Sequence, residues 1–398
     1  MKKYILALTA AATLLGACEV DDKYYGKEVV DPAEKLEPAY GEDWTAHADK
    51  IDEKLIENFM NTDRGTFWYT DQDRTNESTY CYWPQAHAMD VLIDAYLRIP
   101  EGDARRDTYA GYMSKWYDNK GNNYGNSYWG TYGFGNAYTD DSEWIILTLI
   151  RMYEATGVQK YLDAARKTYE ETVIARWTDD ENGGGIRWSF DAENSKNACS
   201  NGPGALCANS PEGAERDQYL ADAKKIYNWL SSTLYNPLTG AVSDNMKNGV
   251  INGGALTYNQ GTFMGAAHEL YKATGDAKYM TDAARAARYT MKSMVTNGVL
   301  NNEGSGDNAL FKGIFVRYAM NVWKDASVDK ADVGLRREIE EFLIYNGLVC
   351  WRDGVDKSEG SKWFFGGFWG EPGSSWDGRL NEQVSASTMI EAMALLIE

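Results

Sequence analysis

Apolar positions along most of the chain recur with the period of an α-helix. From Asp43 onward, apolar side chains spaced three or four residues apart form stripes, as in Ile51, Leu55 and Phe59. Strand-like alternation of apolar and polar residues is nearly absent. The pattern predicts an all-α protein with amphipathic helices around residues 51–59, 89–96 and 145–153, and over 158–176, 217–234, 258–273, 276–295, 309–325, 333–348 and 383–397.

An internal repeat groups these helices into hairpins. Tyr153-Glu-Ala-Thr-Gly157 recurs 118 residues later as Tyr271-Lys-Ala-Thr-Gly275. In each copy a glycine follows an amphipathic helix, where it can adopt the left-handed capping conformation, and a second helix begins within a few residues. With about 50–60 residues per hairpin, the domain holds about six hairpins. Six hairpins favour a closed (α/α)6 toroid, although an open superhelix fits the same spacing.

The first residues have the features of an export signal. A short cationic start, Met1-Lys2-Lys3, precedes an apolar run from Ile5 to Leu15 that is too short to span a bilayer. The run ends in Leu15-Gly16-Ala17-Cys18, which resembles the lipobox of bacterial lipoproteins. In a lipobox the chain is cut before the cysteine, and the cysteine carries the lipid. An ordinary secretory signal with a chance cysteine is the alternative.

This start predicts three segments. Residues 1–17 are expected to be a lipoprotein signal peptide, residues 18–42 a lipidated Cys18 with a flexible acidic tether, and residues 43–398 the folded domain. No later stretch reaches the ~18 apolar residues of a transmembrane helix, so the lipid would be the only membrane anchor. We expect a monomeric outer-membrane lipoprotein of a Gram-negative bacterium, at the cell surface or on the periplasmic face.

Charge and composition limit the classes of molecule that the protein can bind. Lys and Arg number 40 against 59 Asp and Glu, and the net charge of −19 argues against a nucleic-acid partner, because phosphate binding needs clustered cations. Aromatic residues make up 13% of the chain. This is more than a disordered acidic chain carries, and it leaves aromatic surface for a ligand.

Neither a metal nor a cofactor is expected. Only three His are present, and no C-x-x-C or H-x-x-x-H spacing of a zinc site appears. In an exported protein, Cys81, Cys199, Cys207 and Cys350 are candidates for disulfides. Cys199 and Cys207 are nearest in sequence, but on one helix they would lie about 12 Å apart, too far for a bond. The pairing stays open.

Aromatic and amide residues cluster in the segments between the predicted helices. Aromatic rings stack on the C–H faces of pyranose sugars, while amides and carboxylates bind their hydroxyls. Core packing explains any single aromatic residue, but loops that precede alternate helices would meet at one rim of the toroid. We therefore expect a carbohydrate site there. The segments are Tyr80–Gln85, Tyr124–Gly130, Gly183–Trp188, Tyr258–Gly261 and Trp363–Trp369.

The most specific local feature is Asp140-Asp141, which follows Tyr138-Thr139 and precedes an apolar helix face. Two acids at a helix start can simply cap free N–H groups and complement the helix dipole. The alternative is a glycosidase pair, in which one carboxylate attacks the anomeric carbon and the other protonates the leaving oxygen. Neighbouring residues reach the ~5–5.5 Å separation of retaining enzymes more easily than the ~6.5–9.5 Å of inverting ones.

Together these motifs resemble glycoside hydrolase family 76, the endo-acting α-1,6-mannanases and their fungal wall relatives. The family has an (α/α)6 fold and uses an adjacent Asp-Asp pair with retention. The resemblance runs from about residue 44 to the end of the chain. In the family's order, the matching stretches are Tyr82–Leu92, Tyr138–Asp141 with Trp144, Gly184–Trp188, Lys196-Asn197 with Ser200-Asn201, Gly240–Asp244, Tyr258–Phe263 and Phe311–Phe315.

The resemblance implies an α-mannan or manno-oligosaccharide substrate, with Asp140 as the nucleophile and Asp141 as the general acid/base. A helix N-terminus should keep Asp140 ionised, and its charge should raise the pKa of Asp141. His87 and Asp90 are expected to be structural. The candidates for substrate binding are Asp244, Trp83, Gln85, Trp188, Asn197, Asn201, Asn259, Gln260, Asp307 and Lys312.

One segment departs from the family pattern. The residues from Cys199 to Arg216 are richer in Gly and Pro than the helix that usually follows the family's Lys-Asn. This composition predicts a shortened inner helix and a reshaped sugar subsite.

Three functions fit the sequence. The first is a retaining endo-α-1,6-mannosidase, the second an anchored glycan-binding lipoprotein of a polysaccharide-uptake system, and the third a transglycosidase of the same fold with a sugar as acceptor. The intact Asp140-Asp141 pair favours an enzyme, since a pure binding protein has no need of two adjacent acids beside stacking loops. Hydrolysis and transfer both remain open at this stage.

Overall fold

A computed structural model describes residues 35–74, 82–123, 134–190, 195–209, 216–371 and 378–397. The predicted signal peptide, Cys18, most of the tether and Cys81 lie outside these residues. Within them, no helix combines the length and the apolar character needed to cross a membrane.

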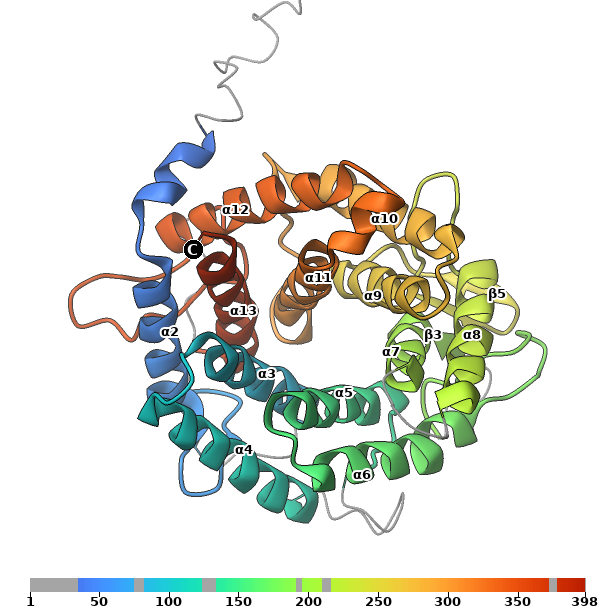
Figure 1. Ribbon diagram of the computed structural model, residues 1–398, viewed down its shortest axis with the longest axis horizontal. Helices are drawn as coiled ribbons and strands as arrows, with labels where there is room; N and C mark the ends of the chain where they lie inside the picture. Colours follow the sequence, from blue (N-terminus) through green and yellow to red (C-terminus); the bar gives the residue numbers. More distant parts are fainter. Residues whose placement is uncertain are drawn as a thin grey trace, which may run out of the picture.

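The described residues contain twelve α-helices arranged as two concentric rings (Figure 1). Each inner helix packs against the next, and α13 packs against α3, so the ring is closed. The closed (α/α)6 toroid is therefore confirmed, and the open superhelix is wrong. The inner helices are α3 (Tyr82–Arg98), α5 (Thr139–Thr156), α7 (Ala198–Asn209), α9 (Thr257–Thr274), α11 (Asp307–Lys324) and α13 (Leu380–Leu396). The outer helices are α2 (Trp44–Phe59), α4 (Ala104–Asn123), α6 (Gln159–Thr168), α8 (Arg216–Thr233), α10 (Ala277–Ser293) and α12 (Leu335–Asp353).

The repeated Thr-Gly motif ends α5 and α9 in the same way. Gly157 and Gly275 have φ values of 68° and 70°, and their N–H groups donate to the carbonyls of Tyr153 and Tyr271. This left-handed cap, which suits glycine, turns each inner helix into the following outer helix. The predicted hairpins are confirmed. As a result, the inner helices begin at one mouth of the toroid and end at the other.

Every predicted helical segment overlaps an observed α-helix, although α2, α3 and α5 begin six or seven residues before the expected ranges 51–59, 89–96 and 145–153. The range 158–176 is α6 followed by a π-helical turn (Tyr169–Val173) and a 3-10 turn (Ile174–Arg176). The helix α4 was not predicted, and α7 was expected only as a shortened inner helix in the Gly- and Pro-rich segment, without a range. The buried face of α4 holds Met113 and Trp116 in a segment otherwise rich in polar residues and tyrosine. Further 3-10 turns cover Glu37–Gly41 and Ala326–Lys330.

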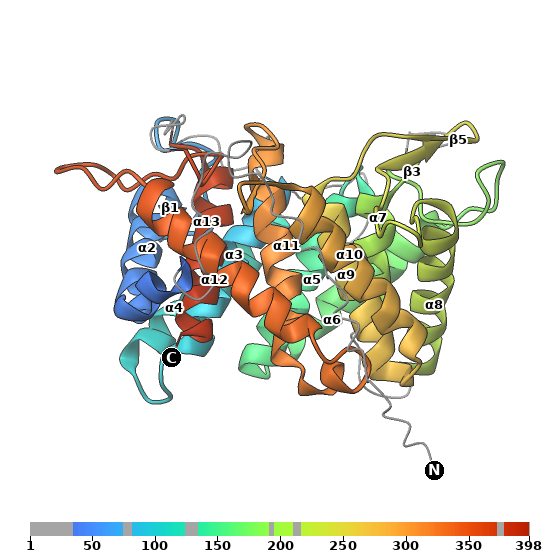
Figure 2. The same ribbon diagram turned by 90° about the horizontal axis from the view of Figure 1, so that it is seen from above.

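Short antiparallel strands occupy the links that lead from outer to inner helices. Figure 2 shows β1, β3 and β5 at the mouth where the inner helices begin. These links therefore build one face of the ring. The sheets are β1 (Met60–Asn61) with β2 (Thr66–Phe67), β3 (Ser195–Asn197) with β4 (Asn245–Lys247) and β5 (Val250–Asn252), and β6 (Val295–Thr296) with β7 (Val299–Leu300).

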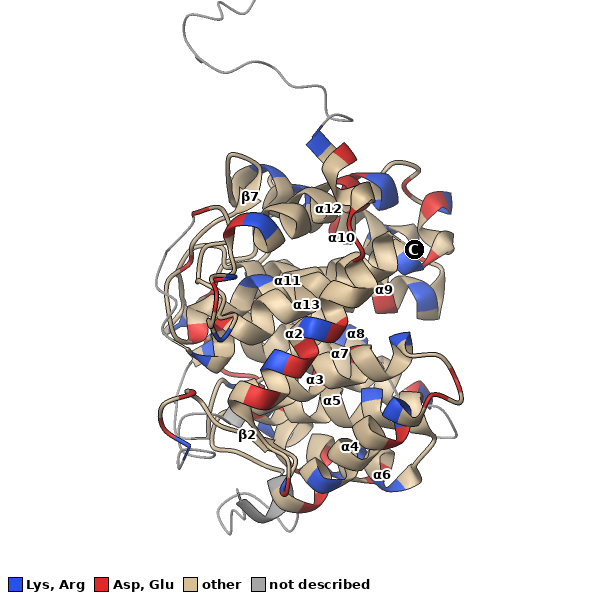
Figure 3. Cartoon of the chain, turned by 90° about the vertical axis from the view of Figure 1, so that its left-hand side faces the viewer, with Lys and Arg blue, Asp and Glu red and all other residues tan. Residues whose placement is uncertain are grey.

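The inner and outer helices differ in how much of their surface is buried. Every residue of α13 from Leu380 to Ala394 is buried, as expected for a helix surrounded by others. The outer helices expose charged faces, and in Figure 3 Lys and Arg alternate with Asp and Glu along α2. Both signs are interspersed on this side of the molecule.

The Gly- and Pro-rich segment forms α7, a short inner helix of 12 residues that contains Pro203. A Cβ on Gly202 would lie 2.5 Å from the Thr262 hydroxyl of α9, and one on Gly204 would lie 2.8 Å from Oε1 of Glu143 on α5. The small residues let α7 approach both neighbours closely. Cys199 and Cys207 both lie on this helix as free, buried thiols, and Cys350 is free as well.

Candidate active site

A cleft of about 700 Å³ opens at the mouth where the inner helices begin. It brings together the first turns of α3, α5, α7, α9 and α11 with the preceding loops and β3–β4. The lining residues are Trp83, Tyr138, Asp140, Asp141, Trp144, Trp188, Ser195, Asn197, Cys199, Asp244, Asn245, Lys247, Leu256, Tyr258, Asp307, Asn308 and Phe311.

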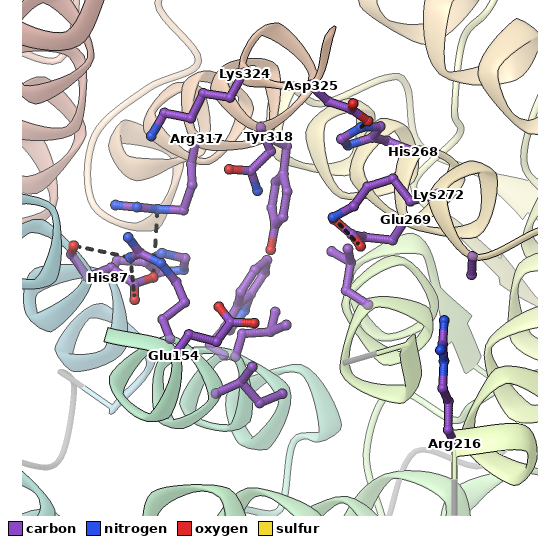
Figure 4. A pocket seen from close by; sticks show the side chains of 18 residues that line it. His87, Glu154, Arg216, His268, Glu269, Lys272, Arg317, Tyr318, Lys324 and Asp325 are labelled. Carbon is purple, nitrogen blue, oxygen red and sulfur yellow. Dashed lines mark hydrogen bonds and ion pairs between the residues drawn. The ribbon is translucent and has the colours of Figure 1, made fainter. Parts of the chain in front are cut away.

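A second cavity, of about 770 Å³, lies at the opposite mouth (Figure 4). Its carboxylates face cations: Asp90 pairs with Arg151 at 2.8 Å, and Arg317 lies 3.7 Å from the same carboxylate. His268 hydrogen-bonds to Asp325 at 2.8 Å. Cations near helix C-termini complement the negative end of the helix dipole. The ion pairs of Asp90 agree with the structural role expected for it, and the predicted catalytic pair lies on the first cleft rather than on this one.

The loop before α5 fixes the position of Asp140. Arg176 donates to the carbonyls of Asn136 and Ala137 at 2.7 and 3.2 Å. The Thr139 N–H donates to the Trp188 carbonyl at 2.8 Å. Asp140 and Asp141 follow in the first helical turn, where free backbone N–H groups gather. Asp140 and Asp141 thus lie on the cleft directly after a loop whose backbone is fixed by these hydrogen bonds.

The environment of Asp140 differs from the expectation that the helix N-terminus keeps it fully ionised. Burial raises the pKa of Asp140 to about 6, against hydrogen bonds from the Cys199 thiol, nearby backbone N–H groups and the Trp188 indole, which lower it. Desolvation therefore outweighs the helix terminus. At neutral pH the ionised form still predominates.

Aromatic rings form the floor of the cleft. Tyr258 stacks on Phe311 with a centroid distance of 4.0 Å, and Trp83 lies 6.4 Å from both Phe311 and Trp144. The buried His87 ring packs against Trp83 and Trp144 from the side of the second cavity. Flat faces of this kind suit the C–H surfaces of sugars.

The structure brings together Asp140, Asp141 and half of the predicted substrate-binding residues. Trp83 and Asp307 lie on the cleft and are joined by a hydrogen bond of 3.3 Å from the indole N–H. Asp244 accepts hydrogen bonds from Asn245 and Asn259 at 2.9 and 3.1 Å. The predicted binding residues on the cleft are Trp83, Trp188, Asn197, Asp244 and Asp307.

The other five lie behind the cleft and use their polar groups within the protein. Gln85 accepts from the Phe67 N–H and donates to the Phe67 carbonyl, at 2.9 and 2.6 Å. Asn201 accepts a hydrogen bond from the Ile186 N–H and donates one to the Ile186 carbonyl. Gln260 accepts from the Val242 N–H and donates to the Gly240 carbonyl. These amides form a clamp: their hydrogen bonds fix the backbone of the segments that connect outer to inner helices and line the cleft. Asn259 supports Asp244, and Lys312, fully buried, donates to the Gly367 carbonyl.

We expect loss of one such clamp to lower stability. Gln260→Ala leaves the Val242 N–H and the Gly240 carbonyl buried without this partner, so the free energy of unfolding should fall by about 2–4 kcal/mol. Denaturant unfolding measures the effect. Gln159→Ala, which removes an exposed amide bonded to Asp163, should change it by less than about 0.5 kcal/mol. A Gln260→Ala protein as stable as wild type would contradict the clamp.

Sequence reasoning missed several residues of the cleft. Tyr258 and Phe311 lie in the stretches that resemble the family, but an aromatic residue can equally pack in the core. Cys199 was predicted only as a disulfide candidate. Asn245 and Lys247 alternate along β4, opposite Asn197 and Ser195 of β3, so both pairs face the cleft. Strands of three residues leave too short a pattern to be found in advance.

A metal site would need several His, Cys, Asp or Glu side chains close together. No group of three or more His, Cys, Asp or Glu side chains is placed there to hold a metal ion.

Comparisons with known proteins agree with this geometry. An α-1,6-mannanase of Salegentibacter sp. HEL1_6 is 36% identical, with a TM-score of 0.76 over 89% of this chain and 100% of that one. An inactive variant of that enzyme with two consecutive aspartates replaced by asparagine, in complex with α-1,6-mannotriose, is 35% identical, with a TM-score of 0.77 and the same coverage. A family 76 mannosidase of Bacteroides thetaiotaomicron, at 18% identity and a TM-score of 0.74 over 89% of this chain and 99% of that one, shares the fold.

No curated protein matches the chain. The model of glycosyl hydrolase family 76, however, matches residues 43–397, which is nearly the whole toroid. The closed double ring, the paired aspartates on its cleft and this match lead to one assignment. The chain belongs to glycosyl hydrolase family 76.

Proposed function

We propose that the protein is a retaining, endo-acting glycoside hydrolase that cleaves α-1,6-mannosidic bonds in the backbone of α-mannan. Asp140 is the nucleophile and Asp141 the general acid/base. The observation that carries the proposal is the pair of consecutive aspartates on the wall of a cleft floored by aromatic rings. The Salegentibacter enzyme, inactive when two consecutive aspartates are replaced, supports the same assignment.

The chain holds three consecutive aspartate pairs, and their positions separate them. Asp21-Asp22 precedes the toroid. Asp179-Asp180 lies in the loop before α7, where Asp179 accepts from the Trp177 indole and Asp180 pairs with Lys196 at 3.0 Å. Neither residue of that second pair lines the cleft. Asp140-Asp141 is therefore the pair assigned to the reaction.

The chemistry is a double displacement. Asp140 attacks the anomeric carbon while Asp141 gives a proton to the leaving oxygen, and the glycosyl-enzyme is then hydrolysed by a water that Asp141 deprotonates. A cleft of about 700 Å³ is in the range that holds a ligand of several rings, which suits cutting within a chain. The glycan-binding alternative is not favoured, because it leaves the acids on the cleft without a task.

The test is the size of the products released over time from linear α-1,6-mannan. An endo-acting hydrolase gives a ladder of oligosaccharides before small products accumulate. A pure binding protein releases no new reducing ends, and that outcome would overturn the proposal. With α-1,6-manno-oligosaccharides as the substrate instead, products longer than the starting chains would identify the transglycosidase.

The rate should depend on pH through Asp140. Because its pKa is raised to about 6, and attack needs the carboxylate, kcat/KM should fall about tenfold per pH unit below pH 6. Above pH 6 the nucleophile is ionised, so the protonation of Asp140 should no longer change kcat/KM. Initial rates measured from pH 4 to pH 8 check the prediction; an acid limb near the ordinary aspartate value would contradict it.

We further infer that the mature chain is a monomer anchored by lipid on Cys18, in the outer membrane of a Gram-negative bacterium. The support is the Leu15-Gly16-Ala17-Cys18 motif. Cys18→Ala should release the protein from the membrane fraction or block its processing, since the acyl chains are the anchor. Fractionation followed by immunoblotting measures this. Full recovery of Cys18→Ala with the membranes would show that the motif is not a lipobox.

A further inference from the structure

The cleft wall formed by β3 and β4 continues onto a third strand, β5. This strand pairs with β4 so that Val250 lies opposite Lys247, and Asn252 lies opposite Asn245. Residues directly opposite each other in an antiparallel pair point to the same face of the sheet. Lys247 and Asn245 line the cleft. Val250 and Asn252 therefore extend the cleft-facing surface of the sheet past the edge of the cleft.

One row of this surface begins at an aromatic residue inside the cleft. The Trp188 N–H donates to the Ser195 carbonyl at 3.0 Å, and Ser195 lies opposite Lys247. Four side-by-side segments thus contribute one residue each to the row, and the first three of these residues line the cleft. With about 4.8 Å between strands, the row is about 14 Å long. Figure 2 shows β3 and β5 at the rim of this mouth. The row consists of Trp188, Ser195, Lys247 and Val250.

The outer end of the surface offers both apolar and polar groups. Val250 is 58% exposed, and Lys247 and Asn252 are exposed as well. Among the described residues no carboxylate pairs with the Lys247 amine, so its donors are available to a ligand. An apolar side chain between an amine and an amide suits a pyranose, whose C–H face is apolar and whose edge carries hydroxyls.

Strand propensity alone does not account for this arrangement. Valine and isoleucine both favour strands, and Ile251 is 49% exposed beside Val250. Ile251, however, lies opposite Met246 and points to the other face of the sheet. The two β-branched residues are therefore alike in exposure and strand, and they differ in which face they occupy.

The hairpin that carries β5 is held in place. Its turn, Asn248-Gly249, has φ values of 50° and 74°, as in the tight turns that suit two-residue hairpins. The Gly249 N–H donates to Oδ1 of the buried Asn182 at 2.6 Å. After β5, a Cβ on Gly253 would lie 2.6 Å from Cβ of Asp244, so the chain packs closely against the cleft wall. A surface fixed in this way loses little freedom when a ligand binds.

We propose that Lys247, Val250 and Asn252 form a distal sugar subsite, which binds a mannosyl unit of the α-mannan backbone where the chain leaves the cleft. The row that continues from Trp188 to Val250 carries the inference. It rests on the proposed function, because the ligand is the chain that the enzyme cleaves. It adds a preference for long chains over short ones.

The test compares a Val250→Ala, Asn252→Ala double variant with wild type on linear α-1,6-manno-oligosaccharides of increasing length and on α-1,6-mannan. For mannan we expect KM to rise about 3- to 10-fold with kcat within about twofold of wild type, because a distant subsite binds ground state and transition state alike. On the shortest oligosaccharide that is cleaved, KM should match wild type, since that chain ends before β5.

Ile251→Ala is the matched control. It removes an exposed β-branched side chain from the same strand but from the opposite face, so KM on mannan should stay at the wild-type value. The same rise in KM for Ile251→Ala would overturn the proposal. So would a rise in the double variant that is equal on short and long chains, because it would show a disturbed cleft.

Val250→Trp tests the subsite by a gain. A ring at this position adds a stacking surface for the sugar, so KM on mannan should fall about 2- to 5-fold and KM on the shortest substrate should not change. Wild-type values of KM on mannan in both Val250→Trp and the double variant would overturn the proposal, even if one of them folds poorly. Failure of the proposed function is distinct, because then the wild-type protein would cleave no chain of any length.

Discussion

Asp140→Asn should lower kcat on α-1,6-mannan by more than about 10⁴-fold, because in the proposed mechanism Asp140 is the group that forms the glycosyl-enzyme. The loss should be of similar size on substrates with good leaving groups, since attack is needed in every case. Reducing-end release under saturating substrate measures it. Asp179→Asn, in the consecutive pair that does not line the cleft, should remain within about twofold of wild type.

The same substitution should make the fold more stable. Burial raises the pKa of Asp140 from 3.8 to about 6, so protonation stabilises the folded state below about pH 4, and this contribution is lost as the pH rises through 6. At pH 7 the ionised carboxylate costs about 1–3 kcal/mol, part of it screened by water in the cleft. Asparagine removes that cost.

Asp140→Asn should therefore exceed wild type in unfolding free energy at pH 7, and the gap should close below about pH 4. Denaturant unfolding at both pH values measures the difference. If Asp140→Asn loses about 1 kcal/mol at pH 7 and keeps most of its activity, the pair is only a helix cap.

Asp141→Asn should fail in a different way. Without a proton donor, kcat on mannan should fall about 10²–10⁴-fold, but an α-mannosyl fluoride needs no protonation to lose its leaving group. The variant should therefore form the glycosyl-enzyme from the fluoride and stall at its hydrolysis. Intact-protein mass spectrometry should show one added glycosyl group.

Azide distinguishes the roles of the two acids. It needs no general base, so it should restore turnover in Asp141→Asn and give an α-azide, because it attacks the β-linked intermediate from the opposite face. Asp140→Asn should give no α-azide, since it forms no intermediate. An α-azide from Asp140→Asn and none from Asp141→Asn would exchange the two assignments.

Most of the fold could be predicted from the sequence, because the helices and the hairpin turns leave periodic patterns in it. Apolar residues at helical spacing and the Thr-Gly repeat at Gly157 and Gly275 were enough to predict the hairpins, and the number of hairpins predicted the ring. The bounds of α7 could not be predicted from periodicity, because Gly202, Pro203 and Gly204 are poor helix formers, and only the family resemblance indicated a shortened inner helix there. Tight packing between α5 and α9 overrides that preference, and packing of this kind is not visible in one sequence.

The site was only partly predictable. A pair of consecutive aspartates before an apolar helix is a local feature, and it lies on the cleft as expected. Amides are ambiguous: Asn197 faces the cleft, whereas Gln260 binds backbone groups behind it, although both lie in similar motifs. Which way a polar side chain points depends on the register of short strands and on distant partners. Lys312, for example, reaches the Gly367 carbonyl 55 residues away.

The stereochemistry of the first product separates a double displacement through Asp140 from a single displacement by water. Proton NMR of linear α-1,6-mannan in the first minutes after addition of enzyme reports the anomer formed before mutarotation. A double displacement through Asp140 retains configuration, so the new reducing ends should be α. New reducing ends that are β at first would show a single displacement, in which Asp140 forms no glycosyl-enzyme.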